Sequence, residues 1–327
     1  MQACGTRISA ISIAVLSSLS TASAFASLGE QPGFSGEVSV VTGYSKSDSN
    51  LNTDNSELIS SLNGSDSSES NSFVAPLGNL AYTFGSQQSQ QVFIGTTRED
   101  VAVGTLAIEM GYRQMLSNKT VISLSYLPTV LSGNAWQDPY LVGSNREKTD
   151  VSGNAYRLQL KDIAASGISL DVAYGESEYD EEHSGSDLKE LERAAKTLYS
   201  KLSYKLPLSR SAFLLPSIKY VNQSAEGDAM SYSSLGAELS LFKVLNQHQF
   251  VLTASYTNDD YDTVNTLFNK TRTDDQVSLF VAYEYKNLFS YNNLSLISFI
   301  SISEQSSNIE FYESSERSAT LGLNYAF

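Results

Sequence analysis

From Gly36 to its last residue, the chain alternates apolar side chains with small or polar ones. The end of the chain shows this best, where Leu321, Leu323, Tyr325 and Phe327 occupy every second position. Successive side chains of a strand point to opposite faces, so the pattern predicts strands with one apolar face. Many segments are near the ~10 residues of a tilted membrane-crossing strand. The predicted strands are 36–45, 78–85, 90–97, 103–114, 119–131, 150–162, 166–176, 195–206, 212–223, 231–243, 247–257, 275–287, 293–304 and 316–327.

The connections between these strands alternate between short and long. Short turns such as 85–90 and 243–247 interleave with long loops such as 45–77, 176–194 and 258–274. An even-stranded antiparallel barrel in the outer membrane has short turns at one end and long loops at the other. The sequence therefore predicts an all-β fold, a closed antiparallel transmembrane β-barrel of about 14 strands. The alternative is 12 strands, with 78–85 and 90–97 assigned to a long loop.

Two prolines fall inside predicted strands. Pro128 and Pro216 cannot donate a ladder hydrogen bond, and a closed barrel has no free edge to accommodate them. We expect bulges or strand ends there.

The N-terminus has the organisation of a secretory signal peptide. Arg7 precedes the apolar stretch 8–19, and Ala24 ends a small-residue cleavage site, with Ala26 as the alternative. The predicted parts are a signal peptide (1–24), a short periplasmic segment (25–34) and the barrel (35–327). The single cysteine, Cys4, lies in the part removed, which excludes a disulfide scaffold from the mature chain.

The two faces of the predicted strands differ in charge. We expect no charged residue on the apolar face, because a basic residue at the bilayer midplane costs ~2–4 kcal/mol. The opposite face would line a wet lumen, in which bases outnumber acids by seven to four. These predicted pore-lining residues are Glu109, Arg113, Arg157, Lys161, Asp171, Lys201, Lys205, Lys219, Glu238, Glu284 and Lys286.

Tyrosines fall near the strand ends of the apolar face, as the aromatic girdles of a membrane barrel do. Tyr44, Tyr174, Tyr220 and Tyr256 are expected at the loop side. Those expected at the turn side are Tyr82, Tyr112, Tyr204, Tyr285 and Tyr325.

Composition adds an acidic exterior. Charged residues make up 17% of the chain, against about 25% in soluble domains, and the net charge is −15. The long loops carry the acids: 176–194 holds eight acidic and two basic residues. Such loops favour solubility, cation-bridged contact with anionic lipopolysaccharide, or cation enrichment at a pore mouth.

Enzyme and nucleic-acid functions are not predicted, and no cofactor is expected. His183 beside Asp180 and Glu181 is the only acid–histidine cluster, and no second constellation supports catalysis. The acids of 258–262 are a candidate for calcium, but the stretch lacks the glycine and terminal glutamate of an EF-hand loop. There is no basic patch or phosphate-binding glycine loop.

The closing residues Leu321, Leu323, Tyr325 and Phe327 resemble the C-terminal signature of bacterial outer-membrane barrels, which the barrel-assembly machinery reads. The opening stretch 28–36 and the overall layout are similar to a family of uncharacterised proteobacterial outer-membrane proteins that are porin-like. This resemblance implies the fold and the cell outer membrane. It brings no substrate or catalytic residue.

Two functions remain. The first is a monomeric, narrow porin-like channel for ions or small hydrophilic solutes, with anion preference if the barrel wall forms the constriction and cation preference if loop 176–194 folds inward. The second is a non-conducting structural or surface-interaction barrel. Expected partners are outer-membrane lipid and lipopolysaccharide, the barrel-assembly machinery and small solutes.

Overall fold

The computed structural model of the chain describes residues 28, 29, 31–64, 68–96, 108–128 and 133–327, so the predicted signal peptide lies outside the described residues. Strands dominate this part of the chain. They are β1 (Gly33–Asp48), β2 (Ser68–Phe84), β3 (Gln90–Gly95), β4 (Glu109–Met115), β5 (Val121–Pro128), β6 (Gly133–Trp136), β7 (Lys148–Lys161), β8 (Ile168–Tyr179), β9 (Ala195–Tyr204), β10 (Leu206–Ser209), β11 (Ala212–Ala225), β12 (Tyr232–Leu245), β13 (His248–Asn265), β14 (Lys270–Lys286), β15 (Leu294–Ser307) and β16 (Ser314–Ala326).

Short helical turns lie in the connections. They are η1 (Ser86–Gln88), η2 (Ile163–Ala165), α2 (Ser184–Asp187), η3 (Lys189–Leu191), η4 (Asp228–Met230), η5 (Leu288–Ser290) and η6 (Glu310–Tyr312). No helix among the described residues has both the length and the apolar character needed to cross a membrane.

Fourteen strands form one closed antiparallel ring. Strands that follow each other in sequence pair, except that β5 pairs with β7 and β9 with β11, and β16 pairs with β1 to close the ring. The short strands β6 and β10 extend the ladder beside β7 and β11. The predicted fourteen-strand barrel is confirmed. The twelve-strand alternative is wrong, because β2 and β3 are both wall strands and pair over Asn79–Phe84.

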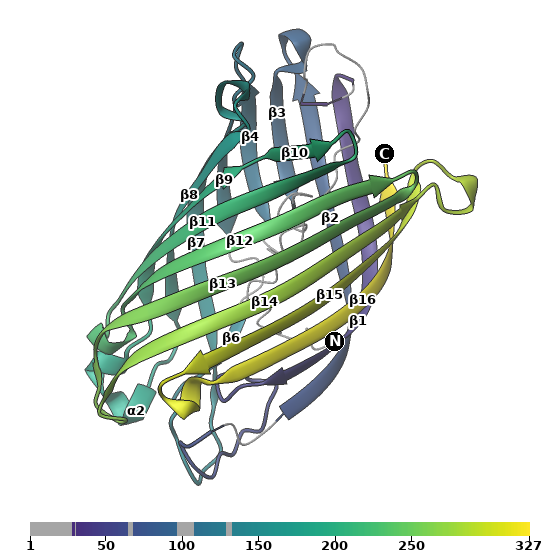
Figure 1. Cartoon of the computed structure of the whole chain (residues 1–327). Helices are drawn as coiled ribbons and strands as arrows, with labels where there is room; N and C mark the ends of the chain where they lie inside the picture. The colour runs from purple at the N-terminus through teal and green to yellow at the C-terminus, as the bar shows by residue number, and fades with distance from the viewer. Residues whose placement is uncertain (1–27, 30, 65–67, 97–107, 129–132) are drawn as a thin grey trace.

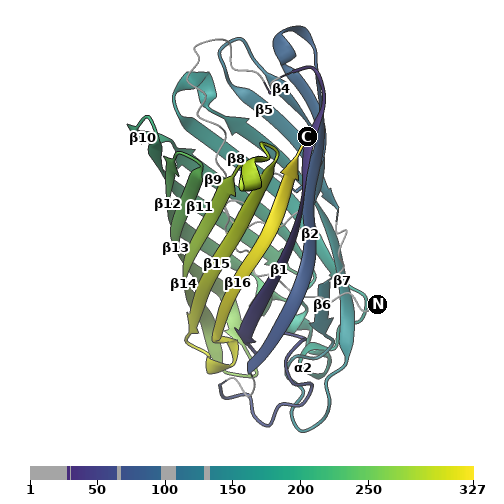
Figure 2. The same cartoon turned by 90° about the vertical axis from the view of Figure 1, so that its right-hand side faces the viewer.

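The ring closes where the first and last strands, β1 and β16, lie side by side (Figure 2). The Phe327 amide donates to the Gly36 carbonyl, and the Gly36 amide donates to the Phe327 carbonyl, at 2.9 Å each. A side chain at Gly36 would strike the Asn79 carbonyl and the Phe327 ring. On the inner face, Asn324 joins Ser39 and Glu37 by hydrogen bonds of 2.6 and 3.2 Å.

The two barrel ends differ, as the connection lengths predicted. We call the end with β10 and the C-terminus the turn end, and the end with α2 and β6 the loop end (Figure 1). Two predicted loops are nevertheless shorter than expected. β2 begins at Ser68 rather than 78, and β13 and β14 run to Asn265 and from Lys270, so most of the predicted loop 258–274 is strand. Polar residues can continue a ladder beyond the apolar band because backbone bonds, not apolar side chains, hold it.

The expected strand end is found at Pro128, the last residue of β5. Pro216 instead lies inside β11 and pairs in register with Leu239 of β12. On the other side of β11, the pairing with β9 begins only at Ser217, the residue after Pro216. Neither proline interrupts a continuous ladder on both sides.

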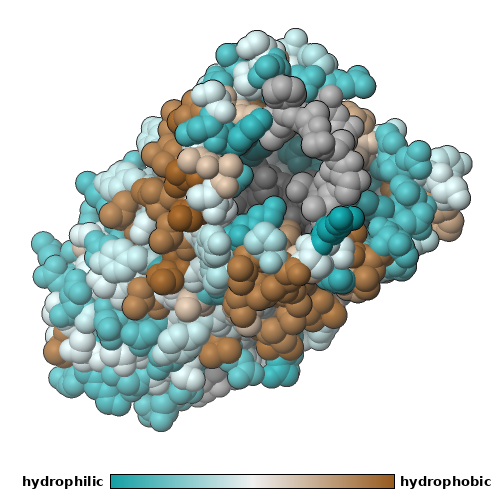
Figure 3. Space-filling view, turned by 45° about the horizontal axis from the view of Figure 1, so that its top comes forward, coloured by the Kyte–Doolittle hydropathy of each residue, from teal (hydrophilic) through white to brown (hydrophobic). Residues whose placement is uncertain are grey.

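The outer face carries an apolar band, brown in Figure 3, with hydrophilic residues toward both ends. The predicted girdle tyrosines point outward; Tyr44, for example, is 52% exposed. Their expected position at strand ends does not hold for Tyr256, which lies in the middle of β13 because that strand continues beyond the apolar band. The prediction that this face holds no charge is wrong at its margins, because water reaches the strand ends. Outward charges include Lys46, Asp150, Glu176, Lys196, Asp275, Glu304 and Arg317 toward the loop end and Lys243 toward the turn end.

Candidate functional site

The barrel encloses a cavity of about 370 Å³, which we call the central chamber. Its wall comes from β7, β8, β9 and β11–β15, whose inward side chains lie on adjacent strands in register. Hydroxyl and amide groups line much of it, including Ser203, Ser255, Thr257, Gln276, Ser278 and Ser303. Six of the predicted pore-lining residues border the chamber: Arg157, Lys161, Asp171, Lys201, Lys219 and Glu238.

The chamber charges form a cross-strand series of ion pairs. Arg157 donates two hydrogen bonds to Asp171, at 2.9 and 2.6 Å, and lies 3.7 Å from Glu109. The buried Glu109 carboxylate also accepts a hydrogen bond from the Ser125 hydroxyl at 2.6 Å. These contacts hold the charged groups against the chamber wall.

A second pair continues the series across the next strands. The Lys201 ammonium lies 2.6 Å from Glu238 Oε1, and both side chains are 12% exposed. Lys219 lies directly opposite Lys201 in the β9–β11 register. Basic residues on the chamber wall exceed acidic ones by one, because Asp162 joins Asp171 and Glu238 against four bases.

The other predicted lining residues do not border the central chamber; apart from Glu109, they belong to the turn end. The Arg113 guanidinium stacks on Phe93 at 3.8 Å, and the exposed Lys205 lies 4.7 Å from the Phe213 ring. The Gln249 amide lies between Glu284 and Lys286; with its nitrogen turned toward Glu284 it donates to that carboxylate at 3.2 Å and accepts from Lys286 at 2.8 Å.

An apolar cluster that the alternating pattern does not predict covers part of the inner wall between the chamber and the turn end. This turn-end cluster consists of Phe213, Leu215, Phe242, Val244, Val251, Phe280, Ala282 and Phe299. Phe213 and Phe242 stack with ring centroids 4.2 Å apart. These strands are apolar on both faces, so their continuous apolar runs were the signal available in the sequence.

A second apolar cluster, which we call the loop cap, is packed at the loop end. Its buried residues are Ile59, Tyr140, Leu191, Ala229, Ile309, Phe311 and Tyr312, and Leu267 and Phe268 pack against it. Six connections contribute, so segments far apart in sequence share one core. The loop 176–194 supplies Leu188 and Leu191 to this core, while Glu181 and Asp187 stay exposed.

Arg146 ties two of the cap loops together. Its guanidinium donates to the carbonyls of Asn50, Ser56 and Glu57, at 2.7, 2.6 and 3.2 Å. It also stacks on Trp136 at 4.2 Å. Burial lowers the pKa of Arg146 to about 10. The side chain is 2% exposed, so these carbonyl acceptors replace water for a buried cation.

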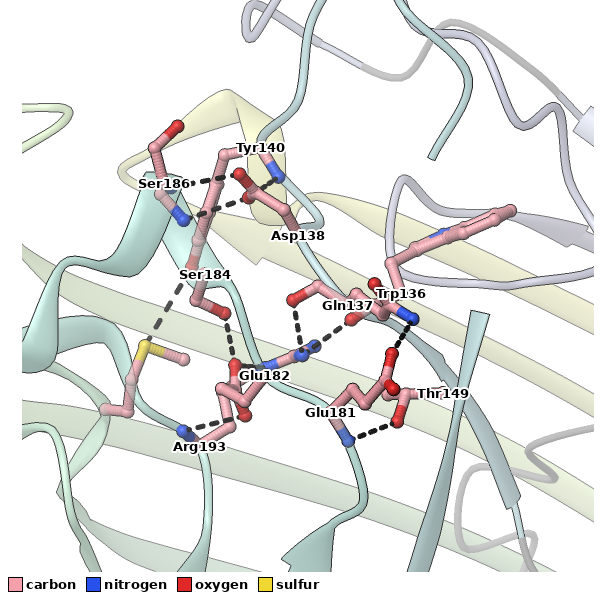
Figure 4. A network of polar contacts seen from close by, with 12 residues as sticks. Trp136, Gln137, Asp138, Tyr140, Thr149, Glu181, Glu182, Ser184, Ser186 and Arg193 are labelled. Carbon is pink, nitrogen blue, oxygen red and sulfur yellow. Dashed lines mark hydrogen bonds and ion pairs between the residues drawn. The ribbon is translucent and has the colours of Figure 1, made fainter. Parts of the chain in front are cut away.

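Arg193 likewise links the neighbouring loop 176–194 to the end of β6 (Figure 4). Its Nε donates to Glu182 at 2.7 Å, and Nη2 donates to the Trp136 carbonyl at 2.6 Å. In the same network, Asp138 accepts hydrogen bonds from the amides of Tyr140, Gly185 and Ser186 (Figure 4). The cap is therefore cross-linked by polar contacts as well as packed.

Aromatic hydroxyls and an ion pair join the cap to the barrel wall. The Tyr140 and Tyr312 hydroxyls lie 2.7 Å apart, and burial raises the pKa of both. The Arg272 guanidinium packs 3.5 Å from the Tyr312 ring and pairs with Asp274 at 2.5 Å. The sequence could not reveal these contacts, because loop residues follow no period.

The structure does not support the two minor candidate sites, the acid–histidine cluster at His183 and the calcium stretch 258–262. His183 Nδ1 lies 2.7 Å from Asp187 at the loop end, and the Glu181 carboxylate accepts from Gln137 instead. The candidate calcium stretch 258–262 lies on strand β13, not in a loop. Among the residues described, no three metal-ligating side chains gather into a possible metal site.

Fold and site together define a closed antiparallel β-barrel with a polar chamber beneath a packed loop cap. The chain belongs to the family described as "Protein of unknown function (DUF2860)", whose sequence profile matches residues 33–326. No curated protein sequence shows significant similarity to it.

Several solved barrels are similar to it in structure. The CymD monoaromatic hydrocarbon channel has a TM-score of 0.47 and 8% identity, over 91% of this chain and 89% of CymD. The outer membrane channel DcaP of Acinetobacter baumannii has a TM-score of 0.43 and 8% identity, over 92% and 100%. A loop L8 deletion mutant of OmpT, an outer membrane protein of Vibrio cholerae, has a TM-score of 0.42 and 6% identity, over 90% and 99%.

Proposed function

We propose that this protein is a narrow, passive outer-membrane channel for ions or small hydrophilic solutes. In this proposal the chain is exported, loses residues 1–24, is inserted by the barrel-assembly machinery and works as a monomer. The apolar outer face between two tyrosine rows supports a bilayer location, since membrane barrels carry this band. The acid-rich loops would then face lipopolysaccharide.

The central chamber is the observation that carries the channel proposal. Side chains fill barrels of about 8 strands, whereas those of 16–18 strands leave an aqueous channel, so lumenal residues decide the case in between. Here the lumen retains a space of about 370 Å³ with hydroxyl, amide and charged groups on its wall. Polar groups of this kind replace part of a solute's hydration shell.

The loop cap favours a second candidate, a closed structural or surface-interaction barrel. Six connections pack into one apolar core at the loop end, with Phe311 and Leu191 fully buried. A mouth that stays closed would make the loops a binding or protective surface. The two candidates differ in whether the cap opens.

Planar-bilayer recording of the refolded protein tests the channel proposal. The wild type should conduct with a mild anion preference, because bases exceed acids on the chamber wall. The double substitution Lys201→Glu, Lys219→Glu should shift the reversal potential toward cation preference. Lys219→Met, which adds no carboxylate beside Glu238, should give a smaller shift in the same direction.

Lys205→Glu is the matched control, because this lysine lies at the turn end outside the chamber wall. It should change the reversal potential less than the chamber double substitution. Heat-modifiable mobility on gels would confirm that each variant is folded. Absence of current from folded protein at every voltage would count against the channel and support the closed barrel.

A further inference from the structure

Lys219 carries a charge that its surroundings do not neutralise directly. Within the described part of the chain it makes no ion pair or hydrogen bond, although it borders the central chamber. Two carboxylates act on it electrostatically without contacting it: Glu238 pairs with Lys201, and Asp259 is hydrogen-bonded to Ser234. A chamber cation of this kind can accept an anionic ligand.

The strand register gives Lys219 no stabilising partner on the neighbouring strand. Lys219 faces Lys201 directly across the β9–β11 ladder. Like charges opposite each other on adjacent strands are destabilising. A bound anion at Lys219 would relieve the remaining repulsion, because Glu238 contacts Lys201 and neither Glu238 nor Asp259 contacts Lys219.

The chamber also has an apolar side. Leu215 lines it and belongs to the turn-end cluster. Leu215 and Lys219 lie on the same face of β11, four residues apart, which places their Cα atoms roughly 13 Å from each other. Both side chains point inward, and the space left between their ends suits a group the size of a benzene ring or a short alkyl chain.

We propose that the central chamber binds small hydrophobic carboxylates, with the carboxylate at Lys219 Nζ and the apolar group toward Leu215. This deepens the proposed channel function, on which it rests for its biological role. Chamber hydroxyls such as Ser203 and Ser278 offer further hydrogen bonds to the carboxylate. The site selects an organic anion over a simple one because two chemically different walls contact it.

Equilibrium binding to the full refolded protein in nanodiscs, followed by ligand-observed NMR titration, tests the site without requiring current. The probes are benzoate, its uncharged analogue benzamide and the small anion acetate. Benzoate should bind at least about tenfold more tightly than either of the others, since each lacks one of the two contacts. Equal binding of benzoate and benzamide, or of benzoate and acetate, would overturn the proposal using wild-type protein alone.

Substitutions then locate the site. Lys219→Met should weaken benzoate binding by about tenfold or more, while Lys219→Arg should retain it. Leu215→Ser should reduce the preference for benzoate over acetate. Lys46→Met, at an exposed lysine on the outer face of β1, is the matched control and should bind as wild type does. Benzoate affinity unchanged in Lys219→Met would refute the assignment.

The outcomes for the chamber site and for the channel are separable. Benzoate binding without current would leave the site in place and defeat the channel. Current without selective benzoate binding would keep the channel and defeat the carboxylate site.

Discussion

At the scale of residues, buried charges are held by acceptors that the folded loops supply. Arg146, in the loop that follows β6, is the clearest case, because its guanidinium binds carbonyls of the 49–64 connection and stacks on Trp136 at the end of β6. Carbonyl groups left without a donor in a buried setting cost ~1–3 kcal/mol. One arginine therefore couples the order of two loops.

Arg146→Met should loosen these two loops while the barrel remains folded. A loss of about 2 kcal/mol of local stability corresponds to roughly thirtyfold faster limited proteolysis within 49–64 and 133–147. Lys148→Met is the control, since Lys148 is exposed and lies 5.7 Å from the same Trp136 ring. Equal cleavage of both variants would show that Arg146 does not link the loops.

The loop imidazole His183 gives a pH prediction. Its hydrogen bond to Asp187 raises its pKa above the usual 6.5. The contact is therefore complete below the usual value and is lost as pH rises through the raised pKa. NMR titration should show the His183 pKa falling toward 6.5 in Asp187→Asn, with His183→Gln assigning the signal. A pKa that Asp187→Asn leaves unchanged would contradict the contact.

At the scale of elements, the period-two pattern predicted the barrel wall but not what closes it. Strands such as β7 and β8 could be placed because lipid and water impose different side chains on their two faces. The start of β2 was missed because Ser68–Ser72 carries no apolar residue to mark a strand. Tyr140 and Phe311 could not be paired from sequence, since loop packing depends on contacts between distant segments.

For the candidate lumenal residues too, the sequence pattern predicted the face of the strand but not the contacts. Strand parity was enough to place Arg157 and Lys201 on one face, and both border the chamber. Parity could not say which charges pair, because pairing depends on strand register. It also could not separate the turn-end residue Lys205 from the chamber group.

The seam between β1 and β16 should depend on Phe327. This residue exchanges two backbone hydrogen bonds with Gly36, and its ring lies over that glycine on the outer face. Phe327→Asp should reduce the heat-modifiable, membrane-inserted form while export stays intact, because a charge would replace the last apolar group of the row. Assay of cell fractions by gel mobility would measure both. Wild-type amounts of inserted variant would remove this role.

At the scale of the whole molecule, one side of the lumen, the wall of β11–β15, has three layers along the barrel. An apolar cluster lies toward the turn end, the polar chamber occupies the middle, and the loop cap lies at the loop end. The cap core joins six connections around the mouth, so in the proposed channel we expect the cap to control access to the chamber.

The most direct measurement is single-channel recording of folded wild type beside the cap variant Tyr140→Ser, Phe311→Ser. These rings are buried with centroids 5.1 Å apart, so their loss should open the cap. Phe289→Ser, at a 79% exposed turn-end position, is the control. The account predicts small or brief currents from wild type and control, and larger or longer ones from the cap variant. Folded cap variant without any current would contradict a conducting lumen.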